Sequence, residues 1–122
     1  MNFFVKPDDT IAIKIYAHQN GDQFEFFDEP KTSDDEPLSF SFRRPNYQDS
    51  TAILSVAQTF VNGEMQLNSV ILADQVVRQL LVGWSLKDDN GDPIACKYSN
   101  VAQANPELMR MVAQKILNVI KI

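Results

Sequence analysis

The stretch 11–16, Ile-Ala-Ile-Lys-Ile-Tyr, places an isoleucine at every second position, which is typical of a half-buried β-strand. Asn20-Gly21 follows, a dipeptide that readily adopts the positive backbone angles of a tight hairpin turn. Segments 23–28 and 38–43 continue the alternation of side chains. We therefore expect a three-strand antiparallel β-meander in a β-rich part over about residues 1–45.

Three segments in the rest of the chain, about residues 46–122, repeat apolar residues at helical spacing: 51–61, 68–82 and 106–120. Asp49 or Ser50 can cap the first segment, and Asn62-Gly63 can stop it, because glycine tolerates the left-handed conformation that ends helices. Asn105-Pro106-Glu107 has the order of cap, first-turn proline and acidic residue that begins a helix. The sequence predicts an α+β fold, with three helices packed on the meander in a single domain over 1–122.

Composition limits the function. The 16 Asp and Glu against 11 Lys and Arg give a net charge of -5, whereas proteins that bind nucleic acid or anionic lipid usually carry a basic surface. One Cys excludes an internal disulfide, and one Cys with one His leaves too few ligands for an ordinary zinc site. No window approaches the ~20 apolar residues of a membrane-spanning helix. We expect no cofactor, no metal, no nucleic acid and no membrane, and a reducing cytoplasm as the compartment.

The residues that carry catalytic chemistry are few and scattered. His18 has no obvious partner nearby in sequence, and we interpret it as a solvated turn residue. Cys96 is interpreted as an ordinary buried or half-buried residue rather than a nucleophile. Asp88-Asn90-Asp92 begins like a calcium loop, but Pro93 and Ser99 occupy the positions that need glycine and a bidentate acid. We therefore interpret it as a turn between two short extended segments.

Aromatic residues are concentrated before residue 45. A sheet covered on one side by helices would bury four phenylalanines: Phe24, Phe26, Phe40 and Phe42. Phe3, Phe4 and Phe27 are then surplus, and surplus aromatics usually mark a partner surface. A sheet buried on both faces, or a dimer, would explain the same residues. Trp84 completes the predicted partner-binding set, although a lone Trp after an apolar helix is more often a core anchor.

An acidic loop over 28–36 lies between the second and third predicted strands. Clustered charge of this kind raises the encounter rate with a basic partner, and it also occurs in ordinary solvated loops that keep a protein soluble. Both interpretations remain open at this point.

The stretch 80–94, Leu-Leu-Val-Gly-Trp-Ser-Leu-Lys-Asp-Asp-Asn-Gly-Asp-Pro-Ile, resembles the tail assembly chaperones of long-tailed bacteriophages. In that family a helix runs into a Trp-containing turn, and an acidic glycine turn then ends in Pro and an apolar residue. A strand such as 40–45, a short segment such as 99–101 and a final helix such as 106–120 fit the same pattern, so the resemblance covers about residues 38–120.

The resemblance implies a non-enzymatic chaperone in the host bacterial cytoplasm. Such a protein binds the tape-measure protein and/or tail-tube subunits during tail morphogenesis, associates with itself along its client, and leaves before the tail is finished. The alternative is a structural virion component, a small tail or baseplate protein that is retained in the particle. An enzyme is the third hypothesis, and the missing catalytic constellations disfavour it.

Overall fold

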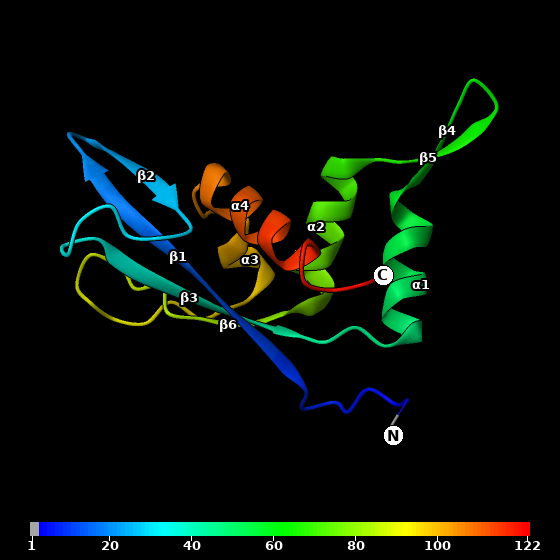
Figure 1. Cartoon of the computed structure of the whole chain (residues 1–122), viewed down its shortest axis with the longest axis horizontal. Helices are drawn as coiled ribbons and strands as arrows, with labels where there is room; N and C mark the ends of the chain where they lie inside the picture. The colour runs from blue at the N-terminus through cyan, green and yellow to red at the C-terminus, as the bar shows by residue number, and fades with distance from the viewer. Residues whose placement is uncertain (1–2) are drawn as a thin grey trace.

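The alternating stretch at residues 11–16 forms part of β1 (Thr10–Asn20) in the computed structural model, which describes residues 3–122. β1 is an inner strand of a four-stranded antiparallel sheet with the order β2-β1-β3-β6 (Figure 1). The other strands of this sheet are β2 (Gln23–Phe27), β3 (Glu36–Arg43) and β6 (Leu81–Trp84). The three strands expected in the first third of the chain are therefore confirmed.

The meander order is wrong, because β3 pairs with β1 and not with β2. β1 has 11 residues, enough to pair with β2 over Tyr16–Asn20 and with β3 over Thr10–Ala17. The chain passes from one side of β1 to the other through residues 28–35. A strand this long offers ladder hydrogen bonds along both of its edges, which no local pattern in the sequence reveals.

Four helices are present among the described residues, against three expected: α1 (Tyr47–Ala57), α2 (Ser69–Leu80), α3 (Tyr98–Val101) and α4 (Pro106–Leu117). The α+β class is thus confirmed, and α3 is an addition of one turn. The cap of α4 is confirmed, since the Asn105 side chain accepts a hydrogen bond from the Leu108 N–H at 3.1 Å. The cap of α1 is Asn46 rather than Asp49 or Ser50, because Asn46 and Asp49 exchange the two bonds of a capping box.

All three predicted helices end earlier than expected, and α4 stops at Leu117 rather than at residue 120. α1 ends at Ala57, and the next residues form β4 (Gln58–Val61), which pairs with β5 (Glu64–Leu67). Asn62 and Gly63 have φ values of 53° and 81°, so this dipeptide makes a two-residue hairpin turn instead of a helix stop. α2 ends at Leu80, and the residues that follow it join the main sheet as β6.

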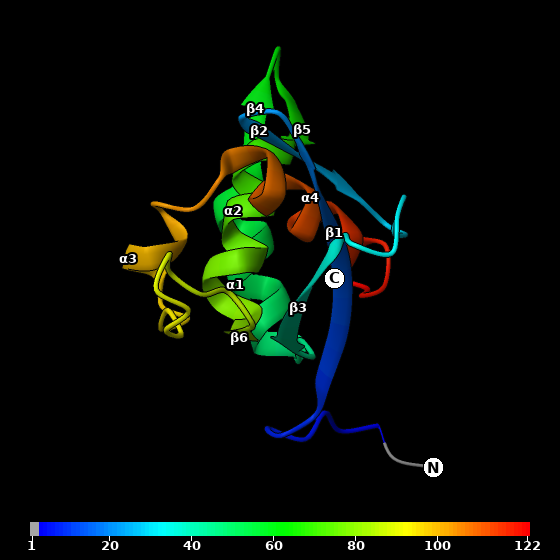
Figure 2. The same ribbon diagram turned by 90° about the vertical axis from the view of Figure 1, so that its left-hand side faces the viewer.

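The core lies between one face of the main sheet and the helices, as Figures 1 and 2 show. Its largest fully buried side chains come from β1, β3 and all three long helices: Phe40, Phe42, Ile15, Ile53, Leu80, Ile116, Val76 and Val112. Phe24 departs from the expected buried set, with 49% of its surface exposed. It lies next to the turn at the free end of the edge strand β2, where the helices do not cover it.

Candidate functional site

The structure does not bring the four residues of the predicted partner-binding set together. Phe3 and Phe4 precede β1 and are 84% and 87% exposed. Phe27 is half-buried at the end of β2, with the Lys31 ammonium 4.3 Å from its ring centroid. Trp84 is half-buried in β6, packs against the core, and donates its indole N–H to the Ile94 carbonyl at 2.6 Å. Because β2 and β6 are opposite edges of the sheet, Phe27 and Trp84 do not share a surface.

A large exposed apolar surface lies instead on the β4–β5 hairpin, which projects from the ends of α1 and α2 (Figure 1). Phe60 lies opposite Met65, and Gln58 lies opposite Leu67. Residues directly opposite each other in an antiparallel pair share a face, and so do residues two apart along one strand. Phe60, Met65 and Leu67 therefore form one apolar surface, called here the hairpin face. Phe60 is 72% exposed, and Met65 and Leu67 are about half exposed.

The hairpin is attached to the body only at its base. β4 follows α1 with no intervening residue, and Asn68 is the single residue between β5 and α2. Asn68 donates its backbone N–H to the Ala57 carbonyl at 2.8 Å, and its side chain caps α2 by accepting from the Val70 and Ile71 N–H groups. A two-stranded hairpin of this kind is marginally stable in water unless something packs against it.

A groove of about 710 Å³ runs between α2, α3 and α4. Its lining is mainly apolar, and it includes small side chains on both long helices, Ala73 on α2 and Ala113 on α4. Val70 forms part of the lining at the start of α2, is 73% exposed, and lies two residues beyond the base of the hairpin. Arg110 lines the groove from α4 and has no ion-pair partner among residues 3–122.

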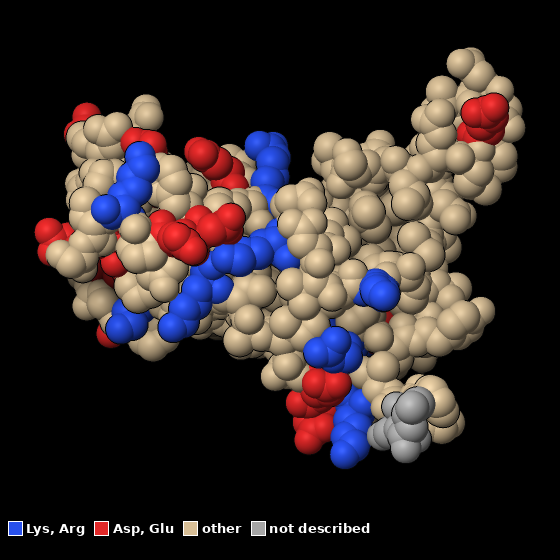
Figure 3. Space-filling view, viewed as in Figure 1, with Lys and Arg blue, Asp and Glu red and all other residues tan. Residues whose placement is uncertain are grey.

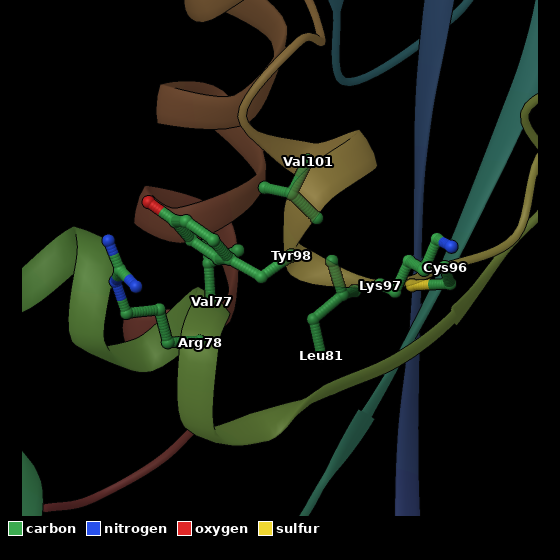
Figure 4. Close-up of a pocket in the computed structure, with 7 residues that line it drawn as sticks. All are labelled: Val77, Arg78, Leu81, Cys96, Lys97, Tyr98 and Val101. Carbon is green, nitrogen blue, oxygen red and sulfur yellow. The ribbon is translucent and has the colours of Figure 1, made fainter.

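Asp74, Arg78 and Tyr98 form a polar cluster that joins α2 to α3, and two of its members, Asp74 and Tyr98, line the groove. Asp74 accepts from Arg78 Nε at 2.7 Å and from the Tyr98 hydroxyl at 2.8 Å. The Arg78 guanidinium lies 3.6 Å from the centroid of the Tyr98 ring (Figure 4). The bond to the Asp74 carboxylate raises the pKa of Tyr98, because it stabilises the protonated hydroxyl that donates the bond. The cluster thereby holds the one-turn helix α3 against the side of the groove.

Cys96 is half-buried, as expected, and lines a small pocket of about 30 Å³ between α2 and α3 (Figure 4). Burial raises the pKa of the Cys96 thiol, so the thiol is protonated at neutral pH. A space of this size admits about one water molecule. The pocket is therefore too small for an organic substrate.

His18 is not a solvated turn residue. It lies in β1, and its Nδ1 is 2.7 Å from a carboxylate oxygen of Asp35. The Asp35 side chain is 3% exposed and also accepts hydrogen bonds from the N–H groups of Lys31 and Thr32 and from the Thr32 hydroxyl. The bond to His18, with these further bonds, lowers the pKa of Asp35. His18 and Asp35 thus anchor the loop between β2 and β3, a tertiary role that sequence spacing does not show.

The acidic segment after Trp84 is a turn, as expected. The Asp88 N–H donates to the Asp92 carbonyl at 2.9 Å, and the Asp88 side chain accepts from the N–H groups of Asn90 and Asp92. Within residues 3–122, no three His, Cys, Asp or Glu side chains are grouped so as to hold a metal ion. No helix in the same range combines the length and hydropathy needed to cross a membrane.

Comparison with family models, with curated proteins and with solved structures finds no match for this chain. Two features of the described residues, the hairpin face and the groove, offer binding surfaces.

Proposed function

We propose that the chain is a non-enzymatic tail assembly chaperone of a long-tailed bacteriophage, acting in the host bacterial cytoplasm on the tape-measure protein and/or tail-tube subunits. The observation that supports this proposal is the apolar groove between α2, α3 and α4. In the proposed function, the groove holds an apolar helical segment of the client and keeps it from aggregating.

The apolar lining of the groove suits one face of an amphipathic helix. Such a helix places apolar side chains at positions i, i+3, i+4 and i+7 along one face, which is the pattern that apolar grooves between helices recognise. Ala73 lets the backbone of a client helix approach closely, because its side chain is short. Arg110 and Gln114 are exposed and provide polar contacts for the outer face of the client.

The state of the reactive side chains also favours binding over catalysis. The Cys96 thiol has a raised pKa and faces a pocket with room for about one water molecule. His18 is engaged with Asp35 in a contact that anchors a loop. Neither residue lines the groove, where a substrate of any size would bind.

Refolding of the tape-measure protein encoded in the same genome tests the proposed function. We expect the purified chain to suppress light scattering when this client is diluted from denaturant, because the groove would cover apolar helices as they form. The variant Val70→Asp should suppress scattering several-fold less well, since it places a charge at the groove. Val82→Ser is the matched control, because Val82 is exposed on β6 and does not line the groove. Equal scattering with and without the wild-type chain would contradict the proposal.

The hairpin face favours an alternative function, that of a structural virion component. An exposed apolar hairpin suits a protein that is built into a particle, where another subunit can cover it. Mass spectrometry of purified phage particles separates the two functions. A chaperone leaves before the tail is complete, so we expect the chain to be absent from particles. Stoichiometric amounts in the particle would establish the structural role instead.

Replacement of both Phe3 and Phe4 by serine is expected to change the free energy of unfolding by less than about 1 kcal/mol, because both side chains are exposed. The same variant should weaken binding to the client if these residues contribute to the partner surface. Thermal unfolding and the light-scattering assay measure the two effects. A large loss of stability would place the two rings in a packed role, and unchanged binding would remove them from the partner surface.

A further inference from the structure

We propose that β1 binds an extended segment of another protein as an added antiparallel strand, in line with β2, and that Lys14 selects a segment with an acidic residue. The binding surface is the unpaired edge of the first half of β1, called here the open edge and defined by the backbone groups of Thr10, Ala12 and Lys14. No residue of β1 lines the groove, so this site is separate from it and does not depend on the proposed function.

The open edge exists because β1 is longer than β2. β3 pairs with residues 10–17 of β1, whereas β2 pairs only with residues 16–20. Figure 1 shows β1 continuing well past the end of β2. The first half of β1 therefore has β3 on one side and no strand on the other.

The register shows which backbone groups face the open side. In an antiparallel ladder the N–H and C=O groups of one residue point to the same side, and the side alternates along the strand. The Asp9 carbonyl accepts from the Arg44 N–H at 2.9 Å, so the odd-numbered residues of β1 face β3. The Lys14 carbonyl, on an even-numbered residue, accepts instead from Lys115 Nζ at 2.7 Å. The even-numbered residues therefore direct their backbone groups to the open side.

These backbone groups are available for a further strand. Thr10, Ala12 and Lys14 are exposed, and apart from the bond to Lys115 their N–H and C=O groups have no hydrogen-bond partner within residues 3–122. The Lys14 carbonyl oxygen has two lone pairs, so it can accept from an added strand while Lys115 remains bound. Such an edge is a template for strand addition, in which backbone hydrogen bonds provide the affinity.

Lys14 sets the charge of the segment that fits. Its side chain is exposed and, in the part of the chain that the structure describes, has no carboxylate in ion-pair range. Figure 3 shows Lys and Arg side chains in a band over the region where β1 and α4 lie in Figure 1. Opposite charges stabilise directly opposed residues of an antiparallel pair, and a lysine on an edge discourages pairing with apolar or basic strands.

The same charge argument favours another protein over a second copy of this chain. The stretch 10–14 contains no acidic residue, so the same stretch of a second copy would not supply a carboxylate to Lys14. Ser39, which lies opposite Lys14 in β3, supplies none either. The occupant is therefore an extended segment of another protein that carries an acidic residue opposite Lys14.

The register also defines a probe, the synthetic peptide acetyl-Glu-Val-Tyr-Val-Thr-amide. Because an added antiparallel strand runs opposite to β1, its first residue lies opposite Lys14, its third opposite Ala12 and its fifth opposite Thr10. These three residues exchange backbone bonds with the open edge and share the face of Lys14. The second and fourth residues place valine beside Ile13 and Ile11, which pack in and against the core.

Amide hydrogen exchange of the full chain, followed by NMR, tests the site. At millimolar peptide we expect exchange of the Ala12 N–H to slow several-fold, because this group gains a hydrogen bond. Exchange of the Ile13 N–H should be unchanged, since it is bonded to β3 with or without peptide. An unchanged Ala12 rate, or peptide-induced shifts confined to the groove, would overturn the proposal.

Methylated peptides test the direction of the backbone groups. N-methylation of the first, third and fifth residues blocks the N–H groups that face the open edge, and should weaken binding about tenfold or more. N-methylation of the second and fourth residues is the matched control, because those N–H groups point away from β1. Equal affinity of the two methylated peptides would overturn the proposed register.

A charge reversal tests the role of Lys14. The wild-type chain should bind the peptide that begins with Glu about fivefold more tightly than the same peptide beginning with Lys. Lys14→Glu should reverse this preference, and it should fold normally because the side chain is exposed. Lys97→Glu, which changes another exposed lysine outside β1, is the control. An unreversed preference in Lys14→Glu would remove Lys14 from the recognition of the segment.

Two further measurements separate the competing outcomes. Protection of the Ala12 N–H that rises with chain concentration in the absence of peptide would identify a second copy as the occupant and overturn the assignment to another protein. The groove variant Val70→Asp should bind the peptide as the wild type does, because Val70 lies outside β1. Peptide binding without suppression of client aggregation would support the open edge alone, and suppression without peptide binding would support the chaperone function alone.

Discussion

Replacement of Phe40 by alanine is expected to lower the free energy of unfolding by about 4 kcal/mol. Phe40 is fully buried in β3, where it lies opposite Ile13 of β1 on one side and Trp84 of β6 on the other. The shortened side chain would leave a cavity that two neighbouring strands and the helices above them cannot close. Urea denaturation followed by circular dichroism measures the loss.

Phe24→Ala is the matched control for this substitution. It removes the same atoms, but Phe24 is 49% exposed on the edge strand β2, so the expected loss is about 1 kcal/mol. Equal losses in the two variants would mean that Phe40 does not occupy the centre of the core.

Replacement of Arg43 by methionine is expected to cost about 2 kcal/mol at neutral pH. The Arg43 guanidinium makes two hydrogen bonds to the Asp49 carboxylate, and its Nη2 also donates to the Gln79 carbonyl at 3.0 Å. One side chain thus joins β3 to the first turn of α1 and the end of α2. Without it, the Asp49 carboxylate, with 14% of its side chain exposed, would lose its charged partner.

Arg44→Met provides the control, because the Arg44–Asp9 pair is nearly half exposed on both sides and such pairs contribute about 0.5 kcal/mol or less. Chemical denaturation of both variants and the wild type gives the comparison. A loss at position 43 no larger than the loss at position 44 would contradict the role assigned to Arg43.

The effect of Arg43→Met should also depend on pH. The bonds from Arg43 lower the pKa of Asp49 below its ordinary value of 3.8. A carboxyl group whose pKa is lower in the folded state contributes its full stabilisation above the unfolded pKa, and loses it as the pH falls through the folded pKa. The difference between wild type and Arg43→Met should therefore be constant near neutral pH and shrink below about pH 4. A difference that grows in acid would contradict this linkage.

Local signals identify several elements correctly, because their causes lie within a few residues. The period-two isoleucines predict β1, and Asn105-Pro106-Glu107 predicts the start of α4, because strand alternation and helix capping depend on neighbours in the chain. The end of α1 is different. The apolar spacing of residues 51–61 suits a helix, and Asn62-Gly63 serves equally as a helix stop or a hairpin turn. The hydrogen bond from Asn68 to Ala57 marks the closed base of the hairpin and has no signature in the local sequence.

The sequence predicts the exposed surfaces less well than it predicts the strands and helices. Residue type predicts Phe27 and Trp84 as partner contacts. In the structure, the Lys31 ammonium lies over the Phe27 ring, and Trp84 packs against the core and donates its indole N–H to the Ile94 carbonyl. The helical spacing of residues 51–61 places Phe60 in a helix, whereas it lies in β4 and is one of the most exposed aromatic side chains of the described residues. Exposure is set by what lies opposite a side chain in space, and a one-dimensional pattern does not contain that information.

The sequence by itself determined the α+β class, the strands of the first third, the capped final helix and the acidic turn at 88–92, because each follows from short-range alternation, capping or turn chemistry. Only the tertiary structure decided that β1 is flanked by both β2 and β3, that His18 holds Asp35, and that residues 58–67 project as a hairpin beside a groove between helices. The physical reason is that these features depend on contacts between segments far apart in the chain. Their energies come from burial and charge pairing, which take effect when the segments meet.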